Sequence, residues 1–263
     1  MIDFKSPIGV ADSGVGGLSV VRALRSELPH EDILYFGDTA NCPYGNKTEE
    51  HLLMLSGNML SFLEKRNAKC IALACNTTSA LAPQLRMRIK TPIITIAECA
   101  ANAVSELDVS AVGVIATKFT IAGGIYNRCI QSAAPGVAVY GIGSANLASL
   151  VERGAPDAEI DSEIRLCMDQ LLKNAPLKDV ILGCTHYPLV MSRFMACYPE
   201  LNFIDPAPQQ AIALRKHLQA EDLLAKPHRA KLTIFTTGDT EAFRAVCKEN
   251  GFDDTYDMEF FHI

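Results

Sequence analysis

Two cysteines, Cys75 and Cys184, each end a short apolar run and precede small polar side chains. The runs are residues 71–74 and 180–183, and each pattern predicts a buried strand, a cysteine and a helix start. A helix N-terminus favours thiolate over thiol, so we expect the pKa of both thiols to fall from about 8.5 toward neutrality. Because ligands gather at the carboxyl ends of strands in open α/β sheets, the two cysteines are candidates for a facing pair.

Polar, glycine-rich turns follow two other apolar runs. Residues 12–17 (DSGVGG) come after the run 8–11, and residues 37–45 (GDTANCPYG) come after the run 33–36. The glycines allow tight turning and a close backbone approach. The GxGG spacing differs from the GxGxxG of dinucleotide loops, and no acidic residue is clearly placed to hold a ribose. A nicotinamide site is therefore poorly supported, and Asp12 and Asp38 also fit ordinary caps or turn formers.

The turns offer neutral donors rather than cations. Ser, Thr, Asn and Gly dominate them, and the first basic residues are Lys47 and Lys118. Neutral donors and helix N-termini can bind a carboxylate without a neutralising cation. Donors aimed at an α-carboxylate also stabilise the negative charge that develops when an α-proton is removed. A carboxylate ligand is thus compatible with these turns.

The apolar runs alternate with segments of helical periodicity, which is typical of βα units around parallel sheets. We expect strands at residues 8–11, 33–36, 71–74, 93–96, 112–115, 180–182 and 232–235. Apolar stripes predict helices over residues 18–28 and 52–63. The predicted fold class is α/β, and the length of 263 residues favours two domains. With prolines at 92, 206 and 208 as crossing points, we expect one domain from residues 1–95 plus 208–263 and a second from residues 96–207.

Composition excludes several other classes of protein. The apolar stretches are only strand-length, which argues against a membrane span, and the first residues show no signal-peptide pattern. Lys plus Arg number 24 against 30 Asp plus Glu, and no basic run supports nucleic-acid binding. The nine cysteines form no CxxC pair or regular framework, which favours free thiols in a reducing cytoplasm. Most of them fit small core residues, and either Cys75 or Cys184 alone would allow the same interpretation.

Four motifs in order along the chain, together with both cysteines, resemble the aspartate/glutamate racemase superfamily and glutamate racemase within it. The motifs are residues 12–18 (DSGVGGL), 37–39 (GDT) with 43–45 (PYG), 74–77 (ACNT) and 183–189 (GCTHYPL). The resemblance covers most of the chain. It implies two pseudo-symmetric α/β domains, each a mainly parallel sheet flanked by helices, with the active site in the cleft between them.

The resemblance also implies an activity, the interconversion of L- and D-glutamate without pyridoxal phosphate, metal or nucleotide. One cysteine removes the α-proton as a thiolate and the other returns a proton from the opposite face, because inversion is simplest with one base on each face. The product would supply peptidoglycan synthesis in a bacterium. The expected partner is a small amino acid rather than a nucleic acid or a membrane. The family is often dimeric, which leaves a homodimer open, although no segment identifies an interface.

The family pattern assigns roles to particular residues of this sequence. Cys75 and Cys184 match the catalytic cysteines, and Asp12, Glu152 and His186 match auxiliary groups of the cleft. Read alone, His186 also fits a helix-start donor. The substrate-holding positions match Ser13, Pro43, Tyr44, Gly45, Asn76, Thr77, Thr117 and Thr185.

Some positions depart from the family pattern and leave substrate preference open. They are residues 93–100 (IITIAECA), Ala116 and residues 144–146 (SAN). Cys99, in the first of these segments, is either a further thiol near the site or a core residue. Racemisation of aspartate or another amino acid is therefore an alternative, and so is a non-catalytic descendant that only binds a ligand. A metal protein using Cys75, Cys184 and His186 is a third alternative, but it would need a fourth ligand.

Overall fold

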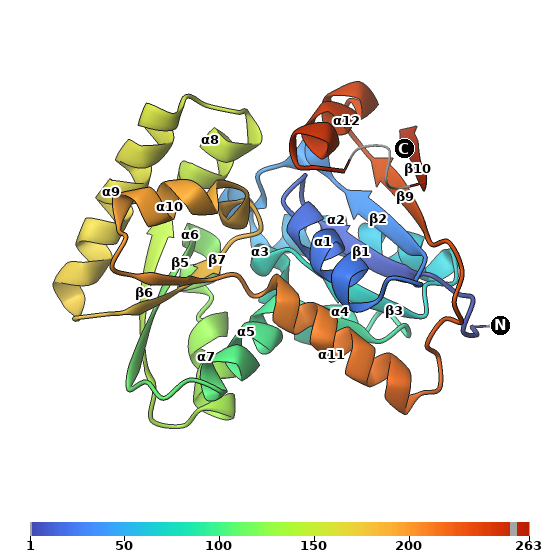
Figure 1. Cartoon of the computed structure of the whole chain (residues 1–263), viewed down its shortest axis with the longest axis horizontal. Helices are drawn as coiled ribbons and strands as arrows, with labels where there is room; N and C mark the ends of the chain where they lie inside the picture. Colours follow the sequence, from blue (N-terminus) through green and yellow to red (C-terminus); the bar gives the residue numbers. More distant parts are fainter. Residues whose placement is uncertain (1, 253–256, 263) are drawn as a thin grey trace.

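The computed structural model describes residues 2–252 and 257–262, and it contains two parallel β-sheets. The six-stranded sheet has the order β10-β9-β2-β1-β3-β4, and the four-stranded sheet has the order β6-β5-β7-β8. Figure 1 shows the sheets in separate halves of the molecule, each flanked by helices. The predicted α/β class is confirmed.

The strands of the larger sheet come from both ends of the described chain. They are β1 (Ile8–Asp12), β2 (Ile33–Gly37), β3 (Cys70–Leu73), β4 (Ile93–Thr95), β9 (Lys231–Thr236) and β10 (Asp257–His262). The smaller sheet contains β5 (Ala111–Thr117), β6 (Ala138–Ser144), β7 (Asp179–Gly183) and β8 (Asn202–Ile204). The chain thus leaves the first sheet after β4 and returns to it with β9. A division into domains at residues 95 and 208 stays a prediction.

All seven predicted strands are present, but β6, β8 and β10 were not predicted. All three are edge strands. In β6, two glycines interrupt the apolar run and most residues are only partly buried, so the sequence lacks the continuous apolar signal of a central strand. β8 has only 3 residues. Central strands are covered by helices on both faces and carry a strong apolar signal. β4 is also an edge strand, but its apolar run at residues 93–96 was enough to predict it.

Helices cover both faces of each sheet (Figure 1). One face of the larger sheet packs on α1 (Leu18–Glu27), α11 (Ala207–Ala220) and α12 (Thr240–Glu249), and its other face packs on α2 (Glu49–Lys65) with α4 (Ala82–Arg86). The smaller sheet lies between α8 (Leu147–Glu152), α9 (Asp157–Asn174) and α10 (Met191–Cys197) on one face and α5 (Ile96–Ser105) and α7 (Ile125–Ala133) on the other. The remaining short elements are η1 (Thr39–Asn41), η2 (Tyr44–Asn46), α3 (Asn76–Ser79), α6 (Lys118–Ala122) and η3 (Tyr187–Val190).

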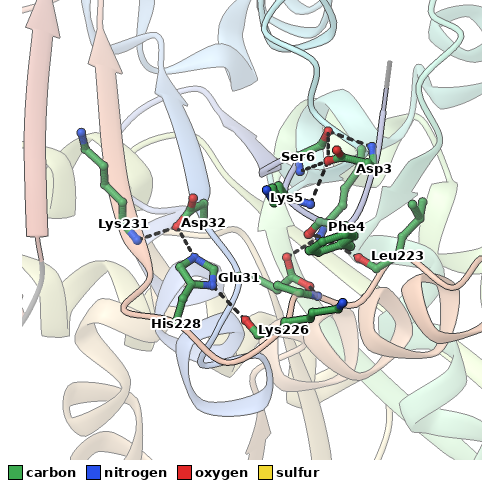
Figure 2. Close-up of polar contacts among 12 residues, drawn as sticks. Asp3, Phe4, Lys5, Ser6, Glu31, Asp32, Leu223, Lys226, His228 and Lys231 are labelled. Carbon is green, nitrogen blue, oxygen red and sulfur yellow. Dashed lines mark hydrogen bonds and ion pairs between the residues drawn. The ribbon is translucent and has the colours of Figure 1, made fainter.

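The connection from α11 to β9 is fixed to the amino end of the larger sheet, on the side away from the carboxyl ends of its strands (Figure 2). The buried Lys69 ammonium pairs with Glu31 at 2.5 Å and donates to the backbone oxygen of Leu223 at 2.8 Å. Asp32 accepts from His228 at 3.1 Å and from the backbone N–H of Lys231 at 2.8 Å. These contacts set the start of β9 beside β2. Among the described residues, no helix is both long enough and apolar enough to cross a membrane.

Candidate active site

A small cavity lies where the carboxyl ends of strands from both sheets meet. Its volume is about 10 Å³, roughly the space of a single water molecule. Its lining is Ser13, Pro43, Tyr44, Gly45, Cys75, Asn76, Thr77, Thr117, Ala148, Cys184, Thr185 and His186. Every residue that the family pattern assigned to the site is in this lining, apart from Asp12 and Glu152, which lie directly behind it.

Cys75 comes from the larger sheet, where it follows β3 and precedes the single turn of α3. Its side chain is buried, and its Sγ donates to the Ser13 hydroxyl at 3.6 Å. The hydroxyls of Thr78 and Ser79 each donate to the Cys75 carbonyl at 3.0 Å and hold the turn. Burial, followed by the charge of Asp12, raises the pKa of Cys75 to about 11. The predicted decrease is therefore wrong for this thiol, because loss of water costs the thiolate more than the 4-residue helix α3 returns.

Cys184 comes from the smaller sheet, where it directly follows β7. Its Sγ lies 3.7 Å from Nδ1 of His186, and the other ring nitrogen, Nε2, pairs with the carboxylate of Glu152 at the end of α8. Burial lowers the pKa of His186, but hydrogen bonds to Cys184, Cys42 and Glu152 oppose burial and raise the pKa well above its usual range. The buried ring thus lies between a thiol and a carboxylate and contacts both.

Asp12, at the end of β1, connects the two sets of turns from behind the cavity. Its carboxylate accepts from the Thr185 hydroxyl at 3.1 Å and from the backbone N–H of Gly14 at 3.1 Å. Burial raises the pKa of Asp12, and the charge of His186 opposes that rise. Asp12 therefore contacts the turn after Cys184 and raises the pKa of Cys75 without lining the cavity.

The glycine turn and the turn after Cys184 touch directly. A Cβ added at Gly16 would lie 2.5 Å from Oγ1 of Thr185 and 2.8 Å from the backbone nitrogen of His186. Only a residue without a side chain allows this approach. On the opposite wall, the hydroxyls of Thr77 and Thr117 lie 3.1 Å apart. Both sheets therefore contribute to one closed site.

Two lining side chains are positioned by residues outside the cavity. The Tyr126 hydroxyl donates to Oδ1 of Asn76 at 2.5 Å, whereas Nδ2 of Asn76 is buried with no hydrogen-bond partner among the described residues. The Tyr44 hydroxyl donates to Asp38 at 2.5 Å. Asp38, for which the sequence also allows a cap or a turn former, thus orients Tyr44, and Asn76 has an unused donor at the cavity.

Sequence reasoning missed Ala148, Cys42 and Tyr126. Ala148 lines the cavity from α8, four residues before Glu152, and this helical spacing was the available signal. Cys42 contacts His186 through a side-chain hydrogen bond that the sequence could not show. Cys99 is buried on α5 and does not line the cavity, as its core interpretation predicted. Among the described residues, the thiols of Cys75 and Cys184 form no close metal-ligand group with His186.

Comparison with known proteins identifies the family of the chain. The family model for Asp/Glu/Hydantoin racemase matches residues 18–213. A glutamate racemase of Thermus thermophilus is 38% identical over 254 residues, which cover 95% of each chain. The crystal structure of a glutamate racemase isoform from Bacillus anthracis superposes with a TM-score of 0.91 at 30% identity, over 98% of this chain and 97% of that one.

The glutamate racemase of Francisella tularensis, solved in complex with D-glutamate, superposes with a TM-score of 0.89 at 30% identity over 99% and 98% of the two chains. The matches extend over nearly the whole chain, including both halves that form the cavity. The chain therefore belongs to the Asp/Glu/hydantoin racemase family, and it is an isomerase of the amino-acid racemase type.

Proposed function

We propose that this enzyme interconverts L- and D-glutamate by proton transfer between Cys75 and Cys184. The observation that carries the proposal is that one thiol from each sheet lines the same small cavity. The glutamate racemase relatives support glutamate as the substrate, since one of them matches at 38% identity along 95% of the chain.

The reaction needs two bases of opposite starting protonation. With one enantiomer bound, the thiolate of one cysteine takes the α-proton, and the thiol of the other cysteine delivers its proton to the opposite face of the resulting carbanion. The first sulfur ends as a thiol and the second as a thiolate. The reverse reaction starts from this second pattern, so each enantiomer uses its own form of the enzyme.

The surrounding residues support the two thiols unequally. His186, which pairs with Glu152, lies against Cys184. Ser13 accepts a hydrogen bond from Cys75, and the charge of the buried Asp12 raises the pKa of Cys75. Neutral donors, among them the free Nδ2 of Asn76, are suited to the substrate carboxylates and to charge developing on the α-carboxylate. Pro43, Tyr44, Gly45, Thr77, Thr117 and Thr185 complete the substrate-holding set that we propose.

The cavity is closed around a space much smaller than an amino acid. Its volume of about 10 Å³ holds a water molecule but not glutamate. The turns after β1 and β7, which touch at Gly16 and Thr185, must separate for substrate to enter. Closure afterwards removes water from the reacting atoms.

Isotope exchange tests the two-base assignment. We expect Cys75→Ala and Cys184→Ala each to lower glutamate racemisation by at least about 10²–10⁴-fold, the contribution of a general acid or base. The measurement is circular dichroism of each glutamate enantiomer with purified protein and no added cofactor, together with deuterium incorporation at Cα in deuterated water. Aspartate and neutral amino acids, assayed in parallel, report substrate preference.

Cys129→Ala is the matched control, because Cys129 lies on α7 away from the cavity. It should retain the parent rate. Substantial racemisation by either active-site variant, in a protein whose far-ultraviolet spectrum is unchanged, would refute the two-base assignment. If deuterium is incorporated into aspartate but not into glutamate, the same mechanism acts on aspartate, the shorter substrate, instead.

We also propose that the D-glutamate formed supplies peptidoglycan synthesis in the cytoplasm. The nine cysteines are all free, which fits a reducing compartment. Growth of a bacterium that requires D-glutamate, restored by the parent gene but not by the Cys184→Ala gene, is the corresponding test.

A further inference from the structure

Three side chains with metal-binding atoms meet behind His186. Sγ of Cys42, a carboxylate oxygen of Glu152 and a ring nitrogen of His186 lie within 4.8 Å of one another, the single such group among the described residues. They come from three separate segments: the loop after η1, the end of α8 and the turn after β7. The fold, and not a local sequence motif, creates this cluster.

Gly14 makes room for the cluster. A Cβ at this position would lie 3.0 Å from Sγ of Cys42 and 2.9 Å from Oε1 of Glu152. Both ligating groups are therefore packed over the same glycine. His186 enters from the other side, with Nδ1 toward Cys184 and Nε2 toward Glu152.

The charge around the cluster favours a cation. The charged neighbours of Cys42 are Glu152 and Asp12, which are acidic, and His186, which is itself one of the three groups. Asp12 is buried directly behind them. A divalent ion that replaced the protons of Cys42 and His186 would neutralise the negative charges of the Glu152 carboxylate and the Cys42 thiolate. The nearby charge of Asp12 would also attract it.

The cluster can be reached without passing through the substrate cavity. Glu152, whose side chain is 21% exposed, lines a separate cavity of about 180 Å³ together with Asp239 and Thr39. His186 lines the substrate cavity, but Cys42 and Glu152 do not. The His186–Glu152 pair therefore separates two spaces, and an ion can approach from the outer one.

The donor set and its dimensions fit zinc. Zn²⁺ binds thiolate, imidazole and carboxylate at about 2.0–2.3 Å, so tetrahedral ligand atoms lie roughly 3.3–3.8 Å apart. Ligand atoms that already lie within 4.8 Å need shifts of only about 1 Å to reach this geometry. Three protein ligands leave a fourth position for water. Mg²⁺ and Ca²⁺, which select oxygen ligands, do not match a thiol and an imidazole.

We propose that Cys42, Glu152 and His186 form a binding site for Zn²⁺ or a similar soft divalent ion, and that the bound ion inhibits the enzyme by withdrawing His186 from Cys184. The binding half of this proposal stands alone, whereas the inhibitory half rests on the proposed racemase function. Because the ion enters from the outer cavity, saturating substrate does not displace it. The inhibition therefore lowers kcat more than it raises KM.

Metal binding is measured first, without any activity assay. Co²⁺ replaces Zn²⁺ as a probe, and its thiolate charge-transfer absorption reports a cysteine ligand; competition with Zn²⁺ then gives the zinc affinity. We expect Cys42→Ser to lose the charge-transfer band. Cys42→Ser and Glu152→Gln should each weaken Zn²⁺ binding by at least about 10–100-fold, the effect of changing a residue that only supports a metal ligand. Cys129→Ser, Cys75→Ser and Cys184→Ser should keep both the band and the affinity.

The inhibition is measured next, with free Zn²⁺ fixed by a metal buffer because glutamate itself binds zinc. Each variant is compared with its own zinc-free rate, and the half-inhibitory Zn²⁺ concentration of Cys42→Ser should rise by the same factor as its dissociation constant. Unchanged zinc affinity in both Cys42→Ser and Glu152→Gln, or loss of the band in Cys184→Ser, overturns the site. If zinc binds at the site and the enzyme racemises at an unchanged rate, only the inhibitory half is overturned. If the protein binds zinc but racemises no amino acid, the proposed function is contradicted instead.

Discussion

At the residue scale, the two thiols occupy unlike environments although they follow similar strands. Cys75 lies beside Ser13. Burial, together with the negative charge of Asp12, raises its pKa to about 11. Cys184 lies against His186, a ring whose pKa is raised. A substrate and product that are mirror images thus meet a site that is not symmetric.

The raised pKa of Cys75 predicts how the rate of racemisation depends on pH. The enantiomer that is deprotonated by Cys75 needs its thiolate, which is rare at neutral pH when the pKa is about 11. The equilibrium constant between enantiomers is fixed by symmetry, so kcat/KM is the same in both directions at each pH. It should rise with pH in both directions, by up to about tenfold per pH unit between pH 7 and 9. Initial racemisation rates of each enantiomer measure the profile, and a flat profile would contradict the assignment of Cys75 as a base of raised pKa.

Asn76 gives a second prediction at this scale. Its Nδ2 is buried without a partner, and Tyr126 holds its Oδ1. If Nδ2 binds the substrate carboxylate, Asn76→Ala should lower kcat/KM by about 10-fold to 10²-fold, corresponding to roughly 1.5–3 kcal/mol for a hydrogen bond to a charged group. Tyr126→Phe removes only the orienting hydroxyl and should lower kcat/KM less. Steady-state kinetics of both variants decide the point, and a parent-like Asn76→Ala enzyme would exclude the contact.

At the element scale, the site depends on how closely the turns of the two sheets approach. The turn after β1 and the turn after β7 touch at Gly16, where Thr185 and the backbone of His186 fill the place of a side chain. Thr185 also donates to Asp12 at 3.1 Å. Hydrogen bonds within each sheet hold its own strands, whereas this contact joins a turn of the larger sheet to the turn that follows Cys184.

Gly16→Ala should therefore damage catalysis more than folding. The added methyl group would lie 2.5 Å from Thr185 Oγ1, so the turns must move apart, and a misplacement of about 1 Å lowers rates by about 10²-fold. Gly57→Ala is the matched control, because nothing lies within 4 Å of that Cβ in α2. It should keep the parent rate and gain about 0.5–1 kcal/mol in free energy of unfolding. Racemisation and urea denaturation of both variants provide the measurement, and equal activity of the two would show that the approach of the turns does not matter.

At the scale of the whole molecule, buried thiols are distributed over several of the packed layers. Burial raises the pKa values of Cys70, Cys99 and Cys247 to about 12 from an ordinary 9.0. In the unfolded chain these thiols ionise near their ordinary value, so between pH 9 and 12 the unfolded state binds fewer protons. The stabilisation is complete below pH 9 and is lost as pH rises toward 12.

The free energy of unfolding should consequently fall above pH 9. Each of these thiols contributes a loss of about 1.4 kcal/mol between pH 8 and pH 10, the energy of one pKa unit. Urea titrations at the two pH values measure the loss, and the Cys247→Ala variant should show a smaller one. A parent protein equally stable at both values, or a variant with the parent's slope, would contradict this account.

The sequence by itself determined the class of fold, the central strands and the polar turns at their carboxyl ends. Central strands of parallel sheets are buried on both faces, so they appear as short apolar runs, and the family motifs fall directly after them. The edge strand β6 and the short strand β8 were not predicted, because a partly buried strand does not need a continuous apolar run. The family resemblance also selected the residues of the cavity lining, with Ala148 as the omission.

Only the tertiary structure decided which groups act on one another. The approach of Cys42 to His186, the pairing of Glu152 with the same ring and the raised pKa of Cys75 depend on segments distant in sequence and on loss of water. A motif can place a thiol at a helix start, but the energy of its charge depends on everything packed around it. For this reason the sequence identified the candidate reactive atoms, and the folded structure determined their surroundings and revealed the cluster behind them.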